Sequence, residues 1–197
     1  MEDKRAFFGH HARSRRLAEF SAEERAKALK LIERFELAPH HVVLEVGSGT
    51  GRLTTLLSPH VREGWIVSLD FSSRMLARSQ QRRHAENVVL VQADASRIPL
   101  RDECVDRALM FCVYPHLPEP LQALVDVHRV LRTGGKLFIA HLAGSREINE
   151  LHRRTGGAVG GDVLPPAAHL ARLLDAQDFR VETAIDEPSG YFVAASR

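Results

Sequence analysis

The sequence has little of several features that mark large classes of proteins. Its 197 residues include only two cysteines, Cys104 and Cys112, which are too few for a disulfide framework or a four-thiolate zinc site. No run approaches the roughly 18 consecutive apolar residues of a membrane-spanning helix, and no apolar stretch of a secretory signal follows the charged start. These absences predict a cytoplasmic protein that does not enter a membrane.

Aromatic residues and net charge are also low. Aromatic residues make up 6% of the chain and apolar residues 44%, which supplies one adequate core and predicts a single domain over residues 1–197. The 27 Lys and Arg residues nearly balance the 25 Asp and Glu residues, so the formal charge is +2. This balance is not typical of a dedicated nucleic-acid-binding protein. Histidine is unusually frequent, with 11 residues in the chain.

Short apolar segments alternate with helical patterns along most of the chain. Segments typical of buried parallel strands lie at 41–46, 65–69, 88–91, 105–113 and 136–140. Helical patterns lie at about 50–58, 72–84 and 119–132, and Gly134 and Gly135 are expected to cap the last of them. A further helix is expected after a capping box at residues 21–24. The alternation predicts an α/β fold with a parallel sheet covered on both faces.

The end of the chain follows a different pattern. After a helix that begins near Pro165 and Pro166, two apolar runs at 179–185 and 191–195 are separated by only five residues. A crossover between parallel strands needs about a dozen residues or more, so these two runs are predicted to form an antiparallel hairpin.

A glycine-rich loop joins the first predicted strand to its helix. Gly47, Gly49 and Gly51 allow a tight turn and the close approach of a ligand, although they can also serve the turn alone. Glu45, at the end of the strand, would repel a phosphate and attract a cation. No Lys-Ser/Thr pair follows the glycines, which disfavours a Walker-type phosphate loop. The loop therefore favours a positively charged ligand over a dinucleotide.

Carboxylates also end the next two predicted strands. Asp70 lies 19 residues beyond Gly51, where an acid can accept hydrogen bonds from both hydroxyls of a ribose. Asp94 is placed to accept a hydrogen bond from an exocyclic amine. Together with Glu45, these acids describe a pocket for an adenosine that carries a cationic amino-acid tail, which is S-adenosylmethionine.

These motifs resemble those of class I S-adenosylmethionine-dependent methyltransferases, and the resemblance extends over nearly the whole chain. The similar motifs lie at 43–51, 67–76, 93–100, 104–108 and 129–137. The resemblance implies a Rossmann-like, doubly wound sheet of seven strands in the order 3-2-1-4-5-7-6, with strand 7 antiparallel. It also implies the residues that hold the cofactor: Glu45, Gly47, Ser48, Gly49 and Gly51 at the methionine part, Asp70 at the ribose, Phe71 and Met75 beside the adenine, Asp94 and Ala95 at its amino group, and Cys112 near the sulfonium.

The methyl acceptor is less clearly marked. The loop at 112–118 lacks the Asn/Asp-Pro-Pro-aromatic signature of many relatives that methylate nucleic acids or proteins, so a small-molecule acceptor is favoured. His116 in this loop is a candidate general base or orienting group, or else a loop histidine bonded to the backbone. A helix capped by Ser145 is expected to follow. If one face of it turns toward the pocket, it would complete a polar rim of His116, His141, Arg146, Asn149 and His152; the alternative is a solvated helix face.

Three further features leave alternatives open. His116, His141 and His152 suit a transition metal by chemistry but have no metal-motif spacing, so no metal is predicted. The glycine-rich stretch at 155–162 is either a lid over the acceptor or a passive connector. In the arm, Phe7, Phe8 and His11 resemble the cap over the cofactor in small methyltransferases, but residues 17–19 depart from the usual tryptophan-aspartate pair.

The sequence thus predicts an arm at 1–20, a cofactor-binding core at 41–140, an acceptor-side insert at 141–165, and a helix with a terminal hairpin at 166–197. Transfer from a sulfonium requires in-line positioning, and a base only where the nucleophile carries a proton; the product is S-adenosylhomocysteine. A non-catalytic module that binds S-adenosylmethionine is one alternative. Another is an RNA or protein methyltransferase that uses arginines of the arm and the second helix: Arg5, Arg13, Arg15, Arg16, Arg74, Arg78, Arg82 and Arg83.

Overall fold

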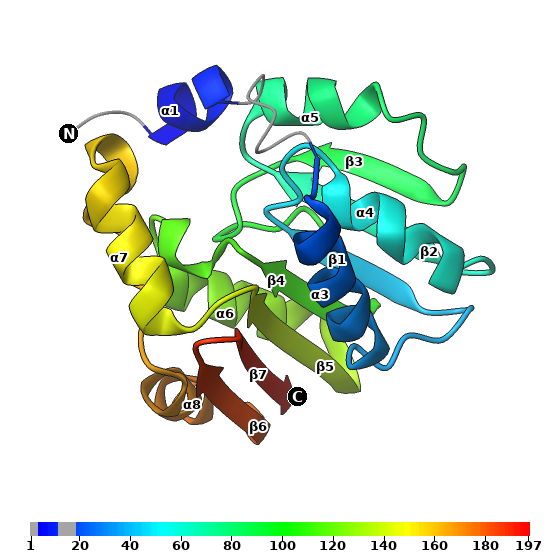
Figure 1. Ribbon diagram of the computed structural model, residues 1–197. Helices are drawn as coiled ribbons and strands as arrows, with labels where there is room; N and C mark the ends of the chain where they lie inside the picture. Colours follow the sequence, from blue (N-terminus) through cyan, green and yellow to red (C-terminus); the bar gives the residue numbers. More distant parts are fainter. Residues whose placement is uncertain (1–3, 12–18) are drawn as a thin grey trace.

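The computed structural model describes residues 4–11 and 19–197, whose strands form one seven-stranded sheet (Figure 1). The strands are β1 (Val42–Val46), β2 (Trp65–Asp70), β3 (Val88–Gln92), β4 (Val105–Phe111), β5 (Leu131–His141), β6 (Arg180–Glu187) and β7 (Gly190–Ser196). Their order is β3-β2-β1-β4-β5-β7-β6, and β7 runs antiparallel to both of its neighbours. The predicted strand order and terminal hairpin are therefore confirmed.

Helices pack against both faces of this sheet. The described helices are α1 (Lys4–His11), α3 (Ala22–Glu33), α4 (Arg52–Leu57), α5 (Ser73–Gln80), α6 (Pro120–Val130), α7 (Ser145–Thr155) and α8 (Ala167–Asp175), with short 3-10 turns at Ser58–His60, Tyr114–His116 and Gly157–Val159. Arg5 and His11 lie in α1, but their side chains are outside the described part of the chain, as are residues 13, 15 and 16 and most of the 17–19 segment.

Alternation along the central strands creates two separate cores. Val43, Leu109 and Phe138 pack with α3 and α4 on one face of the sheet. Their chain neighbours Leu44 and Met110 pack with α6 and α8 on the other face. Successive side chains of a strand point to opposite faces, so strands covered on both sides are apolar throughout. This double burial fixes the carboxyl ends of β1, β2 and β4 beside one another.

Two predicted helix starts are confirmed. The Ser21 side chain accepts a hydrogen bond from the amide of Glu24 at 3.1 Å, while the Glu24 carboxylate accepts one from the amide of Ser21 at 2.8 Å. Ser72 caps α5 by accepting a hydrogen bond from the amide of Met75. Capping satisfies amides that have no partner within the helix, so these residues decide where the two helices begin.

Two local predictions are wrong. Helix α6 ends at Val130, because Leu131 is extended and pairs with Val105, so Gly134 and Gly135 lie within β5 instead of capping a helix. Ser145 is the first residue of α7 and not its cap: its hydroxyl and its amide both donate to the carboxylate of Asp186, at 2.6 and 2.8 Å. In both places a contact with a distant strand overrides the local signal.

Within the described ranges, no helix is both long and apolar enough to cross a bilayer.

Candidate active site

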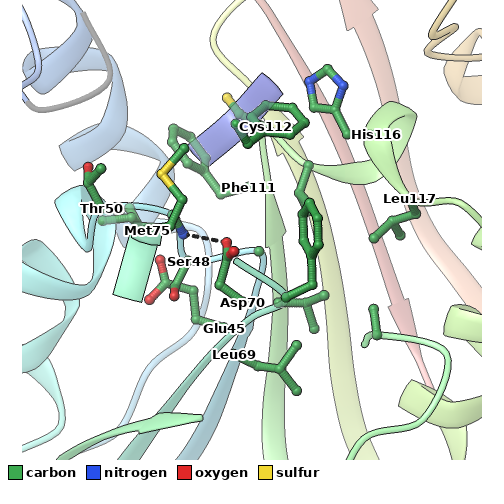
Figure 2. A pocket seen from close by; sticks show the side chains of 18 of the residues that line it. Glu45, Ser48, Thr50, Leu69, Asp70, Met75, Phe111, Cys112, His116 and Leu117 are labelled. Atoms are coloured by element: carbon green, nitrogen blue, oxygen red, sulfur yellow. Dashed lines mark hydrogen bonds between the residues drawn. The ribbon is translucent and has the colours of Figure 1, made fainter. Parts of the chain in front are cut away.

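A pocket opens at the carboxyl ends of β1, β2 and β4, with a volume of about 970 Å³ that includes its open mouth (Figure 2). Figure 2 shows Glu45 and Asp70 near each other at one end of the pocket and His116 at the other. Of the residues predicted to hold the cofactor, all but Gly51 line it: Glu45, Gly47, Ser48, Gly49, Asp70, Phe71, Met75, Asp94, Ala95 and Cys112.

The three glycines of the loop after β1 all have positive φ angles, and each has a different neighbour. A Cβ on Gly47, at φ +70°, would overlap the side chain of Val113. A Cβ on Gly49, at φ +57°, would meet nothing within 4 Å, which leaves the backbone open toward the pocket. Gly51, at φ +76°, lies behind the loop, where a Cβ would collide with Ser79 and His84. Gly49 is therefore the position where a ligand can approach the backbone most closely.

Glu45 is a buried acid at the end of β1. Its Oε2 accepts hydrogen bonds from the hydroxyls of Thr54 at 2.6 Å and Ser68 at 3.0 Å. Burial raises the pKa of Glu45 to about 7, while these two hydrogen bonds limit the rise. A cation that entered the pocket would favour the charged form of this carboxyl.

Asp70 anchors the glycine loop to the end of β2. Its Oδ2 accepts a hydrogen bond from the amide of Gly49 and its Oδ1 accepts one from the amide of Ser72, both at 2.9 Å. Burial raises the pKa of Asp70, and the two amides oppose that rise. Each carboxylate oxygen has a second lone pair, so Asp70 can still accept hydrogen bonds from two hydroxyls.

Another part of the pocket lining combines apolar side chains with a third acid, Asp94. Phe71, Met75 and Ala95 line this part, and Met75 is buried. The Oδ1 of Asp94 accepts hydrogen bonds from the amide and the hydroxyl of Ser96, at 2.9 and 2.8 Å. These contacts hold the Asp94 carboxylate in the same pocket lining as the apolar side chains, a combination that suits an aromatic base with an exocyclic amine.

Helix α1 brings Phe8 into the lining of the pocket. The Phe8 ring contacts Phe71 and His116, with centroids 6.3 and 5.2 Å apart. Helix α1 contacts α5 and the turn at Gly157–Val159, and Figure 1 shows it between α7 and α5. Phe20 and Arg52 are among the lining residues that no motif in the sequence marked, and the Arg52 guanidinium lies 4.3 Å from the centroid of the Phe20 ring.

The five residues predicted to form a polar rim separate into two groups. His116 lines the pocket, and the rings of His116 and His152 are 4.8 Å apart. Arg146 is exposed on α7. Asn149 forms two hydrogen bonds with the backbone of Leu164, at 2.9 and 2.8 Å, and does not line the pocket. Of the five residues, only His116 lines the pocket, with His152 beside it, whereas His141, Arg146 and Asn149 do not line it.

His141 lies at the end of β5 and is buried against Tyr191, with ring centroids 5.8 Å apart. Burial lowers the pKa of His141 to about 3, with smaller contributions from His116 and His152. Its Nε2 has no hydrogen-bond partner among the described residues. Within those residues, no group of three His, Cys, Asp or Glu side chains is arranged to hold a metal ion.

Of the four arginines predicted as RNA contacts in and after α5, two have side-chain partners within the described part of the protein. Arg82 bonds the carbonyl of Thr50 at 2.5 Å and pairs with Glu19 at 3.2 Å, so it braces the glycine loop. Arg78 bonds Gln81 at 2.7 Å, whereas Arg74 and Arg83 are exposed.

Comparisons with known proteins point to one family. Residues 44–139 match the methyltransferase domain family. A demethylmenaquinone methyltransferase of Staphylococcus epidermidis is 37% identical over 94 residues, covering 47% of this chain and 39% of that protein. A malonyl-[acyl-carrier protein] O-methyltransferase of Laribacter hongkongensis is 30% identical over 160 residues, covering 76% and 52%. The chain thus spans about half or less of the length of these relatives.

A solved structure of a SAM-dependent methyltransferase from Aquifex aeolicus has the same fold. It covers 97% of both chains with a TM-score of 0.74 and 23% sequence identity. The family match covers the segment that contains Glu45, the glycine loop, Asp70 and Asp94. This chain therefore carries a methyltransferase domain, and its fold is that of the class I, S-adenosylmethionine-dependent methyltransferases.

Proposed function

We propose that the protein transfers a methyl group from S-adenosylmethionine to a small molecule. One observation carries this proposal: acids at the ends of three strands and the open backbone of Gly49 meet in a single pocket, and His116 lies at its far end. An adenosine with a cationic tail requires such a combination of acceptors and apolar surface.

The described residues fit this cofactor part by part. Glu45 and the backbone from Gly47 to Gly49 would hold the charged methionine part, since a buried acid favours a cation. Asp70 would accept the ribose hydroxyls, and Asp94 the adenine amino group. Phe71 and Met75 would flank the adenine. Gly51 would act indirectly, by supporting the loop against Ser79 and His84.

When bound, the cofactor supplies a methyl group on a sulfonium, which is already an activated leaving group. The task of the chain is to align the acceptor with that methyl group and to exclude water. Phe8 and the loop at 112–118 would enclose the acceptor, and His116 would orient it or take its proton. His141 and His152 would act as neutral neighbours of His116. We place Arg146 and Asn149 outside the reacting site.

The size and surroundings of the pocket support a small-molecule acceptor. Helix α1 covers the pocket through Phe8, which leaves little room for a folded macromolecule. Arg82, one of the candidate RNA contacts, already binds the glycine loop and Glu19. The two relatives reported above are named for methylating demethylmenaquinone and malonyl-[acyl-carrier protein]. We also propose that residues 41–140 bind the cofactor and that 1–20 and 141–165 shape the acceptor site.

Calorimetry of cofactor binding tests the first half of the proposal. S-adenosylmethionine and S-adenosylhomocysteine should bind, and Asp70→Ala should weaken binding about tenfold to a hundredfold, since hydrogen bonds to a charged group are worth about 1.5–3 kcal/mol. Asp175→Ala, at an exposed acid of α8, is the matched control. Equal affinities for the wild type and Asp70→Ala would refute the cofactor assignment.

A screen for S-adenosylhomocysteine release tests the second half. Small molecules that carry hydroxyl, thiol or amino groups are compared with total RNA and with protein substrates. Release that depends on a small molecule supports the proposal. Release only with RNA, together with binding that falls steeply with salt, would support the rival function. Cofactor binding without release across the whole screen would indicate a non-catalytic module.

A further inference from the structure

We propose that Asp162 positions His116 to take a proton from the methyl acceptor, and that Lys4 completes this site when α1 lies across the pocket. The inference rests on the proposed function and deepens it. It assigns a role to an acid in the glycine-rich stretch and to a lysine of the arm, neither of which belongs to a cofactor motif.

The three side chains form a chain of contacts that begins at His116, in the lining of the pocket. Oδ2 of Asp162 lies 2.7 Å from Nδ1 of His116, and its Oδ1 lies 2.6 Å from Nζ of Lys4. Lys4 also donates to the backbone carbonyl of His116 at 3.3 Å. The Asp162 side chain is only 8% exposed, so these contacts are shielded from solvent. Shielding makes a carboxylate more effective at fixing the orientation of its partner.

The carboxylate of Asp162 decides which nitrogen of His116 carries the proton. Burial raises the pKa of Asp162, but hydrogen bonds from His116 and Lys4 outweigh burial and keep its pKa below the ordinary value. An ionised carboxylate only accepts hydrogen bonds, so Nδ1 of His116 must be the protonated nitrogen. Its Nε2 then has a free lone pair, and among the described residues this atom has no hydrogen-bond partner.

Contacts from α7 hold Asp162 in place. The backbone carbonyl of Asp162 lies 2.8 Å from Nδ1 of His152, and Asn149 holds the backbone of Leu164 through two hydrogen bonds. Val159, earlier in the same stretch, is 4% exposed. The glycine-rich stretch therefore packs against α7 and presents its acid to His116. This gives Asn149 and His152 a positioning role.

The remaining groups that face His116 do not compete for its proton. Burial lowers the pKa of both His141 and His152. Both imidazoles are therefore neutral near pH 7, and a positive charge on either would be costly beside Lys4 and a protonated His116. Phe8 covers the ring of His116 from the arm. His116 is thus the imidazole of this cluster that can accept a proton next to a carboxylate.

This arrangement specifies the class of acceptor. The oxygen or sulfur of the acceptor forms a bond to the methyl carbon, and the bond between that carbon and the sulfonium breaks with its electron pair going to the sulfonium sulfur. The proton of the acceptor passes to Nε2 of His116, and Asp162 stabilises the imidazolium that results. The acceptor is therefore a hydroxyl or thiol acidic enough for an imidazole to deprotonate, and not a nucleophile that lacks a proton.

Nitrogen NMR of the imidazoles tests the inference without an acceptor. The ¹⁵N-histidine-labelled wild type is measured with S-adenosylhomocysteine, at a pH where imidazoles are neutral. The signal that disappears in His116→Gln should then report the proton on Nδ1. In Asp162→Asn the amide can donate to Nδ1, so the proton should move to Nε2. Asp175→Asn should leave the signal unchanged. A wild-type ring protonated at Nε2, or an unchanged signal in Asp162→Asn, would overturn the inference.

The wild-type spectrum decides the point even if Asp162→Asn fails to fold. Calorimetry on the same samples separates this inference from the proposed function. If S-adenosylhomocysteine does not bind the wild type, the proposed function fails, whatever the tautomer. If it binds equally to the wild type and Asp162→Asn while the tautomer does not change, only the role of Asp162 fails. With an acceptor from the screen, Asp162→Asn should lower turnover about tenfold or more.

Discussion

Each end of the pocket is held in place by a different kind of contact. At the cofactor end, Asp70 binds the amides of Gly49 and Ser72, so one carboxylate joins loops that leave adjacent strands. At the acceptor end, Asp162 binds Lys4 and His116, which come from the arm and from the loop after β4. The first set of contacts fixes backbone conformation, whereas the second joins side chains from separate segments.

This difference has consequences for how each end works. The loops at the cofactor end are set mainly by the sheet and by positive φ angles, and the arm reaches this end through the contact of Phe8 with Phe71. The contacts at the proposed acceptor end join His116 to two separate segments, α1 and the glycine-rich stretch. We expect changes at the cofactor end to alter affinity or stability, and changes at the acceptor end to alter turnover or local opening.

Replacing the base at the acceptor end should have the largest effect. His116→Gln should lower turnover of an acceptor from the screen by about 10²–10⁴-fold, because it removes the group that takes the proton. Affinity for S-adenosylmethionine, measured by calorimetry, should change little, because the contacts of Glu45 and Asp70 are unaltered. His169→Gln, on the exposed side of α8, is the control. A loss of cofactor affinity in His116→Gln with normal turnover would reverse the roles of the two ends.

Much of the fold follows from the sequence because its signals are local. Alternating apolar segments predict the strands, the short link between the last two runs predicts the hairpin, and Ser21 and Ser72 mark helix starts. The errors occur where a distant strand decides the outcome. Leu131 extends to pair with Val105, and Ser145 binds Asp186 on β6.

The same distinction limits what the sequence predicts about the site. Acids at strand ends, glycines at fixed spacing and the family resemblance that they carry predicted most of the residues that line the cofactor end. Asp162 and Lys4 gave no such signal, because their pairing depends on how the arm and the glycine-rich stretch pack. Arg146 and Asn149 share a helix with His152, but their distance from the pocket depends on the rotation of α7. A helical pattern shows which residues share a face and not what that face contacts.

The buried acid at the cofactor end should make the stability of the free protein depend on pH. The pKa of Glu45 is about 7, against an ordinary value of 4.5, which corresponds to about 3 kcal/mol. Between these values the folded protein keeps a proton that the unfolded chain releases. The contribution of Glu45 to stability is therefore complete below pH 4.5, falls as the pH rises, and is lost above about pH 7.

Glu45→Gln tests this dependence, because glutamine cannot ionise and its amide oxygen can still accept from Thr54 and Ser68. In urea unfolding, the variant should gain up to about 3 kcal/mol over the wild type between pH 5 and pH 8. Glu33→Gln, at an exposed acid of α3, should show no such gain. If the free energies of unfolding of the wild type and Glu45→Gln depend on pH in the same way, burial does not raise the pKa of Glu45 in the free protein.

The smallest effect is expected from loss of the ion pair between Lys4 of the arm and Asp162. Lys4→Met keeps the apolar stem but removes the ion pair with Asp162, which at 27% exposure of the lysine is worth about 1 kcal/mol or less. Hydrogen exchange in residues 4–11 should quicken by up to about fivefold, because α1 opens more often. Exchange at the amide of Gly49 should not change, since the carboxylate of Asp70 holds that amide at the cofactor end. Lys30→Met, at an exposed position of α3, is the control. Equal quickening at both ends of the pocket would show that they open together, and that α1 is part of the cofactor end.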